Sequence, residues 1–404
     1  FTNLAYTFDD KYSISGSFRT DASNFITDDP KYRYSPFWSV GFSWNMMHEE
    51  FMKSQHWLDY LTPRITYGCN GNANTTTSMV PLITMAGVSD ITQEQYARIS
   101  SYGNPQMSWE QTHVVNFGID WSMFGGKFYG KIDVYNKKGT DIMADVSVPI
   151  ASGQLKPGFN IVDAKITANA AEVTNRGFEM ELGSSQDFGA GVHWDGNVTL
   201  AYNKNKVDKL YLGYVGHDKM RDPIPIEGYD INGLWAYQYA GLRERTDDEA
   251  NTYKVPNIYV DNEGNIAPID NILENTDGRK AMKYMGTTVA PWTVGMSHSF
   301  EYKEWALSFT MIGKFGHKFR QTGFNYADPL VTIPNRQYTQ LQDETVMPMP
   351  DNKFINLSHY SSISPYMDYN VKGANHVRMQ ELTLSYSLPQ VLLRKWGISR
   401  LTCY

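Results

Sequence analysis

Hydrophobic and polar residues alternate strictly in many segments of this chain. In residues 12–19 one phase holds Tyr12, Ile14 and Phe18, and the other holds Ser13, Ser15, Ser17 and Arg19. Because successive side chains of a β-strand point to opposite faces, this period of two predicts strands with one apolar and one polar face. The same alternation recurs in further segments, at residues 38–45, 115–121, 178–182, 198–202 and 305–311.

Two architectures fit alternating strands, and the connections distinguish them. A soluble β-sandwich buries its apolar faces between two sheets, whereas a membrane barrel turns them toward lipid. The short connections lie at residues 9–10, 125–126, 184–190, 302–304 and 389–397, and the long ones at 21–36, 73–109, 138–175, 206–290 and 316–374. The connection at 46–63 has middle length and a helix-like pattern around Phe51, Trp57 and Leu61.

Regular alternation of short and long connections is typical of an up-and-down barrel in an outer membrane. In such barrels short turns face the periplasm and long loops face the exterior. We therefore predict an all-β, transmembrane, antiparallel up-and-down β-barrel, with about 12 strands in this chain. Residues 2–8 and 401–404 already alternate, so we expect the chain to be an internal piece of a longer polypeptide.

Composition is compatible with this prediction. The chain is 41% hydrophobic, has a mean hydropathy of -0.45 and lacks the run of about 20 apolar residues needed by a helical span. A barrel strand shows only alternate residues to lipid, so low hydropathy does not exclude a membrane. The aromatic content of 14% is expected where aromatic girdles lie at both membrane interfaces.

Charge and motifs exclude several functions. A net charge of -7 without a concentrated basic face argues against nucleic-acid binding. Cys69 and Cys403 offer no disulfide framework, and no G-x-S-x-G, P-loop, H-E-x-x-H or C-x-x-C motif is present. We therefore expect no enzyme, no cofactor and no metal site. The acidic stretch at residues 261–265 is interpreted as a hydrated turn rather than a calcium loop.

In one predicted strand, the alternation of apolar and polar residues is interrupted. Val377 and Met379 share one phase, but Leu382 and Leu384 lie on the opposite one. This predicts a β-bulge at Gln380 and Glu381, unless the strand simply begins at Leu382.

The connection at residues 206–290 carries the candidate binding site. It contains Trp235, Tyr237 and Tyr239, with Arg221 and Asp222 nearby. Flat aromatic faces combined with a few hydrogen-bonding groups suit sugars or peptides, so we predict that these residues bind a solute. The alternative is that the alternating aromatics form an additional strand and pack against neighbouring loops or a partner.

Six short motifs are spread along the whole chain. They are ITYGCNGN at 65–72, NPQMSWE at 104–110 leading to YNKKGTDIM at 135–143, EVTNRGFEMEL at 172–182, AYNKNKV at 201–207, FEYKEWALSF at 300–309 and VRMQELTLSYSLP at 377–389. Each motif is weak alone, but in this order the set resembles the SusC/RagA family of TonB-dependent transporters from Bacteroidetes outer membranes.

The resemblance implies a barrel of about 22 strands. It also implies an N-terminal plug with a Ton box, and residues 1–404 would then be a partial barrel domain without the plug and the final strands. The implied partners are the TonB-ExbB-ExbD energy-transducing complex, membrane lipid and a SusD-like surface lipoprotein, with a dimer of transporter-lipoprotein pairs left open. The implied solute is an oligosaccharide or an oligopeptide.

The polar phase predicts the inside of this barrel. Its residues are mostly small or polar, for example Ser13, Ser15, Ser39, Gly41, Ser43, Asn116, Gly118, Thr199, Ala201, Thr293, Gly295, Ser297 and Ser308. Small residues leave an interior wide enough for water or a plug. Active import of a large solute is the preferred hypothesis, and a passive porin or a surface-binding adhesion barrel is the alternative.

Overall fold

A computed structural model provides the structure of the chain. It describes residues 1–23, 33–73, 78–101, 103–147, 165–210, 215–246, 249–250, 252–261, 263–268, 277–321, 362–394 and 397–404. The chain divides into two compact units. The first, the wall, comprises Phe1–Tyr211, Pro291–Lys314 and His376–Tyr404, and the second, the loop unit, comprises Leu212–Ala290 and Phe315–Asn375.

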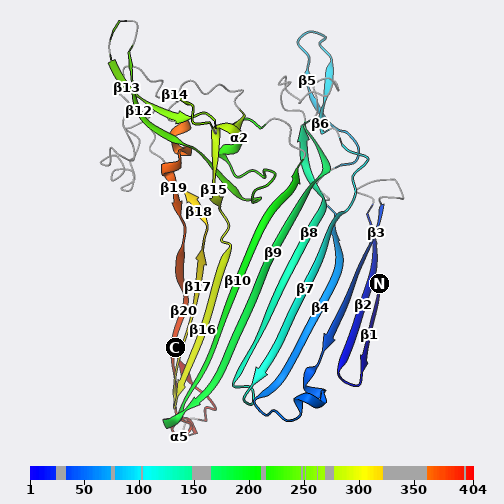
Figure 1. The fold of residues 1–404 in the computed structure, drawn as a ribbon, viewed down its shortest axis with the longest axis vertical. Coiled ribbons are helices and arrows are strands. Elements are labelled where there is room, and N and C mark those ends of the chain that lie inside the picture. The colour runs from blue at the N-terminus through cyan, green and yellow to red at the C-terminus, as the bar shows by residue number, and fades with distance from the viewer. Residues whose placement is uncertain are drawn as a thin grey trace. The chain divides into compact units, whose positions relative to one another are not determined.

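In the described residues, the wall is a single 12-stranded sheet (Figure 1). Its strands, in their order across the sheet, are β1 (Thr2–Phe8), β2 (Tyr12–Ala22), β3 (Tyr34–Trp44), β4 (Leu58–Asn72), β7 (Glu110–Met123), β8 (Phe128–Ser147), β9 (Lys165–Phe188), β10 (Val192–Leu210), β16 (Trp292–Tyr302), β17 (Trp305–Phe315), β20 (His376–Ser387) and β21 (Thr402–Cys403). Neighbours in the sheet follow one another along the chain except where a long connection intervenes. The prediction of about 12 antiparallel up-and-down strands is confirmed.

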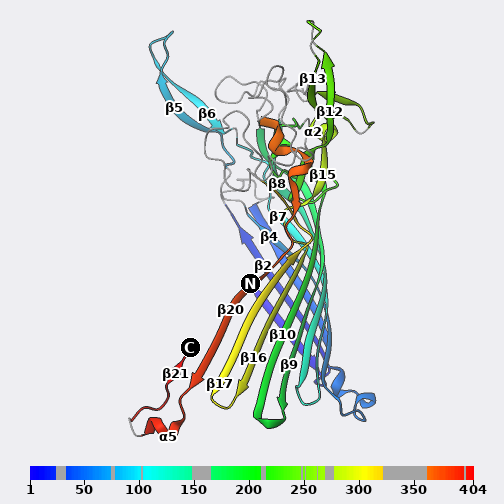
Figure 2. The same cartoon turned by 90° about the vertical axis from the view of Figure 1, so that its left-hand side faces the viewer.

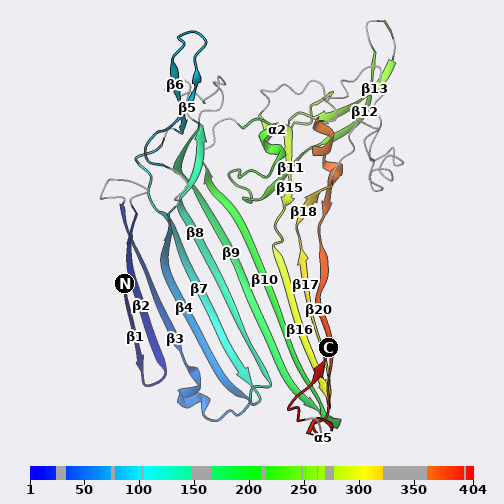
Figure 3. The ribbon, with the colours of Figure 1, turned by 180° about the vertical axis from the view of Figure 1, so that it is seen from behind.

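Short and long connections lie at opposite ends of the strands of this sheet. The pairs Phe8 with Tyr12, Met123 with Phe128 and Phe188 with Val192 close tight turns at one end of the strands, which Figure 3 shows from behind. The long connections all begin and end at the other end of the strands. The β9–β10 turn lies at the 3-10 helix η5 (Gly189–Gly191), because both strands continue past the predicted turn at residues 184–190. The excursion predicted at residues 138–175 is likewise shorter, since β8 extends to Ser147 and β9 begins at Lys165.

The wall has an apolar face and a polar face, and it is curved rather than flat (Figure 2). Residues paired across antiparallel strands share a face. One continuous row of pairs crosses nine strands, through Tyr6, Ile14, Phe42, Ile65, Phe117, Val134, Phe178, Tyr202 and Trp292. Phe117 is 44% exposed and Val134 is 51% exposed, so within the described part of the chain no second sheet covers this face as a sandwich would require.

The large apolar side chains of the apolar face form a band, the apolar band, which runs diagonally across the rows of paired residues. On β3 it lies between Trp38 and Trp44, whereas on β10 it lies between Trp194 and Tyr202. Tyr202 stands in the same row as Phe42, so the band extends above that row on β3 but ends at it on β10. Strands that are tilted relative to the membrane normal produce this offset, as expected of a transmembrane barrel.

A β-bulge restores the apolar phase of β20. Thr310 pairs with Glu381 and Met311 pairs with Met379, so Gln380 is the extra residue. Val377, Met379, Leu382 and Leu384 are all more than half exposed. The bulge predicted at residues 380–381 is confirmed.

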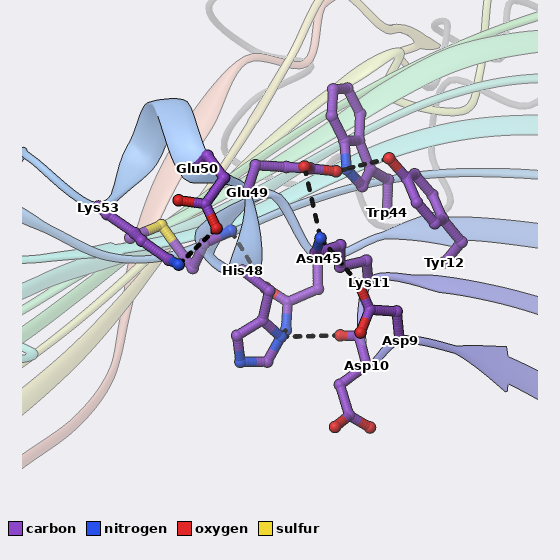
Figure 4. A network of polar contacts seen from close by, with 11 residues as sticks. Asp9, Asp10, Lys11, Tyr12, Trp44, Asn45, His48, Glu49, Glu50 and Lys53 are labelled. Carbon is purple, nitrogen blue, oxygen red and sulfur yellow. Dashed lines mark hydrogen bonds and ion pairs between the residues drawn. The ribbon is translucent and has the colours of Figure 1, made fainter.

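The connection between β3 and β4 consists of two 3-10 helices, η1 (Met46–His48) and η2 (Glu50–Met52). Figure 4 shows how it is fixed: the Tyr12 hydroxyl donates to Glu49 Oε1 at 2.5 Å, and Trp44 Nε1 donates to the same oxygen at 3.1 Å. The hydrogen bond from Tyr12 holds the pKa of Glu49 below its usual value. The helix-like pattern predicted at Leu61 is wrong, because β4 begins at Leu58 and continues through Pro63. Pro63 is tolerated because the β3–β4 pairing only begins at Arg64.

The long connection at residues 73–109 contains a hairpin of β5 (Leu82–Val88) and β6 (Gln95–Ser101). The last short connection carries α5 (Gln390–Leu393). Among the described residues, no helix is long and apolar enough to cross a membrane.

The loop unit is built from two long connections that fold together. Its elements are η6 (Lys219–Arg221), β11 (Gly233–Tyr237), β12 (Tyr239–Thr246), β13 (Thr252–Tyr259), β14 (Ile266–Pro268), α2 (Gly278–Ala281), β15 (Met282–Thr287), β18 (Lys318–Arg320), η8 (Ser364–Tyr366), η9 (Asp368–Asn370) and β19 (Val371–Gly373). Strand β11 pairs with β15, and β18 pairs with β19. The core includes Tyr237 and Ile258 from the first connection and Ile363 and Met367 from the second, each completely buried.

Candidate functional site

An ion-paired cluster occupies the polar face of the wall. Arg64 on β4 donates through Nε to Asp120 on β7 at 3.0 Å, and its Nη2 lies 2.8 Å from the Asp133 carboxylate on β8. Asn116 Nδ2 donates to Asp133 Oδ1 at 2.8 Å. Alternation places all four residues on one face, and register brings them together from three strands. The result is a charged surface on which Arg64 and the two carboxylates are already paired with groups of the wall itself.

A second ion pair continues this surface across β8, β9 and β10. Lys131 Nζ lies 2.8 Å from Glu181 Oε2, and Asn197 Nδ2 donates to Glu181 Oε1 at 2.8 Å. These charged residues are not among the candidates predicted from the sequence, although their position on the polar phase could have identified them. Such a surface is compatible with water or with a polar protein segment, not with lipid.

Larger side chains also lie on the polar face than the predicted small residues suggest. The rings of Tyr129 and Tyr135 occupy the space above Gly183 and Gly177, where a Cβ atom would have no room. Arg64 similarly covers Gly118. Glycines on this face therefore leave room for the side chains of their bulky neighbours.

In the loop unit, Tyr237 is the centre of a buried polar contact. Its hydroxyl lies 2.5 Å from His217 Nδ1 and accepts a hydrogen bond from Arg221 Nε at 3.4 Å. Burial raises the pKa of Tyr237, so the phenol stays protonated at neutral pH. The hydroxyl is therefore held by the unit's own side chains.

Arg320, from the second long connection, fastens the two connections together. Its Nη2 donates to the Trp235 carbonyl at 2.6 Å, and its Nη1 donates to the Arg221 carbonyl. Its guanidinium carbon lies 4.6 Å from the ring centre of Tyr366, and that of Arg221 lies 5.3 Å from the same ring. Burial lowers the pKa of Arg320, but an arginine remains charged at neutral pH. Two cations on one aromatic ring form a compact cross-link.

The structure brings the predicted site residues into one unit but gives them different environments. Trp235 is 3% exposed and Tyr237 is 0% exposed, whereas Arg221 and Tyr239 are half-buried and Asp222 is exposed. Trp235 packs against other rings of the unit, with centre-to-centre distances of 4.8 Å to Tyr229 and 5.5 Å to Tyr284. Trp235 and Tyr237 thus lie on a strand and pack internally, as in the alternative interpretation. Contact of these residues with a solute stays a prediction.

In the acidic stretch predicted as a hydrated turn, the described residues Asp261, Glu263 and Asn265 are joined by turn-type hydrogen bonds. Asp261 Oδ1 accepts hydrogen bonds from the backbone N–H groups of Glu263 at 2.9 Å and Asn265 at 3.1 Å. The side chain of Asn265 also donates to Asp261, and this hydrogen bond lowers the pKa of the carboxyl group. Within the described residues, no group of three or more His, Cys, Asp or Glu side chains is arranged to hold a metal ion.

A family model described as "TonB dependent receptor-like, beta-barrel" matches residues 1–343. The chain belongs to this family. Its members are proteins of the outer membrane, and the wall's lipid-compatible face agrees with that location.

Relatives and solved structures support the membership. The chain is 24% identical to "TonB-dependent receptor SusC" of Bacteroides thetaiotaomicron over 96% of its length, and 23% identical to "TonB-dependent receptor P26" of Formosa agariphila over all of it. It covers 37% and 40% of those proteins. The solved RagAB peptide importer in its "open-open" state superimposes with a TM-score of 0.72 at 20% identity, over 97% of this chain and 40% of the other. The fold is therefore that of a SusC/RagA-type barrel, and the chain spans about two fifths of the relatives' length.

Proposed function

We propose that the chain forms part of the barrel of an importer that moves a large solute actively across the outer membrane. The observation that carries the proposal is the polar face of the wall, where Arg64, Asp120 and Asp133 are paired with one another. A face of this kind suits an aqueous or plugged interior. Membership in the TonB-dependent receptor family supports the TonB-ExbB-ExbD complex as the energy source of this import.

The solute is an oligosaccharide or an oligopeptide. The similarity to RagAB, which is described as a peptide transporter, supports the peptide alternative. The same similarity supports a SusD-like surface lipoprotein as partner, and a dimer of transporter-lipoprotein pairs is part of the proposal.

The solute would be bound among the long connections, in the region of Arg221, Asp222, Trp235, Tyr237 and Tyr239. The burial of Trp235 and Tyr237 favours a supporting role for these two, in which they hold the loop unit in shape. The exposed carboxylate of Asp222 and the half-buried Tyr239 are then the groups best placed to touch a ligand.

Deletion of the Ton box from the full-length protein tests the proposal. We expect growth on the cognate solute to be abolished while binding of the solute to whole cells is unchanged, because binding needs no energy. A deletion of equal length in the exposed β5–β6 hairpin serves as a control for assembly. Undiminished uptake after Ton-box deletion would show passive diffusion and would favour the porin alternative, and binding without any uptake in the wild type would favour an adhesion barrel.

A further inference from the structure

A basic pair lies on the apolar side of the wall, immediately beyond its aromatic boundary. Arg176 on β9 and Lys204 on β10 are directly paired across the strands, and Asn136 on β8 pairs with Arg176. Each lies two residues from an apolar-face residue, Arg176 from Phe178 and Lys204 from Tyr202, so all share that face. Two residues along a strand correspond to about 7 Å. The pair therefore stands just above the hydrocarbon-facing surface.

The residues below the pair form an aromatic platform. The ring centres of Tyr202 and Trp292 are 4.5 Å apart, and that of Phe178 lies 5.8 Å from Trp292. Aromatic residues of this kind mark the level of the membrane interface in barrels. The platform lies toward the end of the strands from which the long connections leave, which is the exterior side of an outer-membrane barrel.

In the described residues, Arg176 and Lys204 lack the ion-pair partners that neighbouring lysines have. On the same face, Lys138 lies 3.1 Å from Glu172, and Lys206 lies 3.8 Å from Asp208. Within the described residues, no ion pair involves Arg176 or Lys204, and the recorded partner of Arg176 is the Asn136 side-chain oxygen, 3.1 Å from Nε. Both side chains are exposed. Like charges directly opposite each other destabilise a sheet unless an anion compensates them.

We propose that Arg176 and Lys204 bind the phosphate of an outer-leaflet glycolipid, with the lipid A class as the occupant. The planar guanidinium of Arg176 and the ammonium of Lys204 suit a phosphate group. The amide of Asn136 is suited to the hydroxyl groups of the attached sugar. The acyl chains of the same molecule would lie along Phe178, Tyr202 and the apolar band below them. Continuity with the lipid-facing surface selects a lipid over a soluble anion.

Native mass spectrometry of the full-length protein, titrated with monophosphorylated lipid A in detergent, tests this site. We expect the double variant Arg176→Gln/Lys204→Gln to bind at least about tenfold more weakly than the wild type. A matched control, Lys137→Gln/Lys314→Gln, removes two charges from the opposite phase of the wall and should bind like the wild type. Arg176→Lys keeps the charge and should retain most of the binding, which separates loss of the site from misfolding.

Three outcomes would overturn the proposal. The first is equal affinity of the double variant and the wild type. The second is equally tight binding of chemically dephosphorylated lipid A to the wild type. The third is displacement of lipid A by inorganic phosphate at equimolar concentration, which would indicate a site for a free anion. None of these measurements depends on transport, so failure here leaves the proposed function untouched.

Discussion

The wall and the loop unit place their large apolar side chains in opposite environments. In the wall, Val134 is 51% exposed and Leu384 is 56% exposed, while the charged Arg64 is held among partners on the other face. In the loop unit, Tyr237 and Met367 are completely buried. The loop unit follows the ordinary rule for proteins in water, and the wall reverses it because lipid covers one face. The same chain thus contains two folding problems that differ in solvent rather than in residue chemistry.

The largest effect is expected in the core of the loop unit. Trp235→Ala should destabilise that unit by about 3–5 kcal/mol, because it removes a buried ring that packs against both Tyr229 and Tyr284. Hydrogen exchange of the full-length protein should show loss of protection in β11 and β15 while the wall strands stay protected. Leu242→Ala, at an exposed position of β12, is the control and should change little. Equal loss of protection in the wall would mean that the two units are not separate folding problems.

A charge on the apolar face of the wall should have the next largest effect. Phe117→Arg should cost about 2–4 kcal/mol in denaturant unfolding from lipid vesicles, because the guanidinium would face hydrocarbon. The adjacent Asn116→Arg is the matched control, since that side chain points to the polar face near Asp133 and should be tolerated far better. Similar costs at the two positions would contradict the assignment of the faces.

A smaller effect, which depends on pH, is expected at Asp368. Burial raises the pKa of this carboxyl group above 3.8, against the weaker opposing effects of backbone hydrogen bonds, first among them that from the Tyr239 N–H, and of Lys283. The folded loop unit therefore holds this proton more tightly than the unfolded chain does. The part of the unit's stability that comes from this protonated group is lost as the pH rises from the unfolded-state pKa through the raised pKa. Asp368→Asn keeps an oxygen that accepts from the Tyr239 N–H and should remove this pH dependence. Protease resistance measured between about pH 4 and 8 should show a slope only in the wild type, and an unchanged slope in the variant would exclude Asp368 as its source.

The wall could be predicted from the sequence far better than the loop unit. The long wall strands carry their own period of two, and even the extra residue Gln380 could be located from the phase of Val377 and Leu382. The sequence pattern did not predict the start of β4, because Leu61 continued a helix-like pattern and Pro63 is typical of the end of a connection rather than of a strand interior. These errors are local, since strand pairing follows from chain order.

The loop unit depends on contacts between residues far apart in the sequence. Arg320 reaches the carbonyl groups of Arg221 and Trp235, and Tyr237 forms an isolated bridge with Met367. No local period encodes such contacts, so the aromatic residues of this region could be found but their burial could not. The ion pairs of Arg64 were missed for a different reason: phase gives the face of a residue, and only register gives its partners.

The bulge at Gln380 shows how a membrane wall can tolerate a change in length. Adding one residue to a strand exchanges the side chains that meet lipid and water for the remainder of that strand. A bulge absorbs the added residue locally, so Met379 and Leu382 reach the same membrane although one has an odd number and the other an even number. Barrels can therefore diverge by single insertions without changes in the neighbouring strands. In a pairwise sequence alignment that crosses β20, the lipid-facing positions should change between odd and even numbers at this one residue.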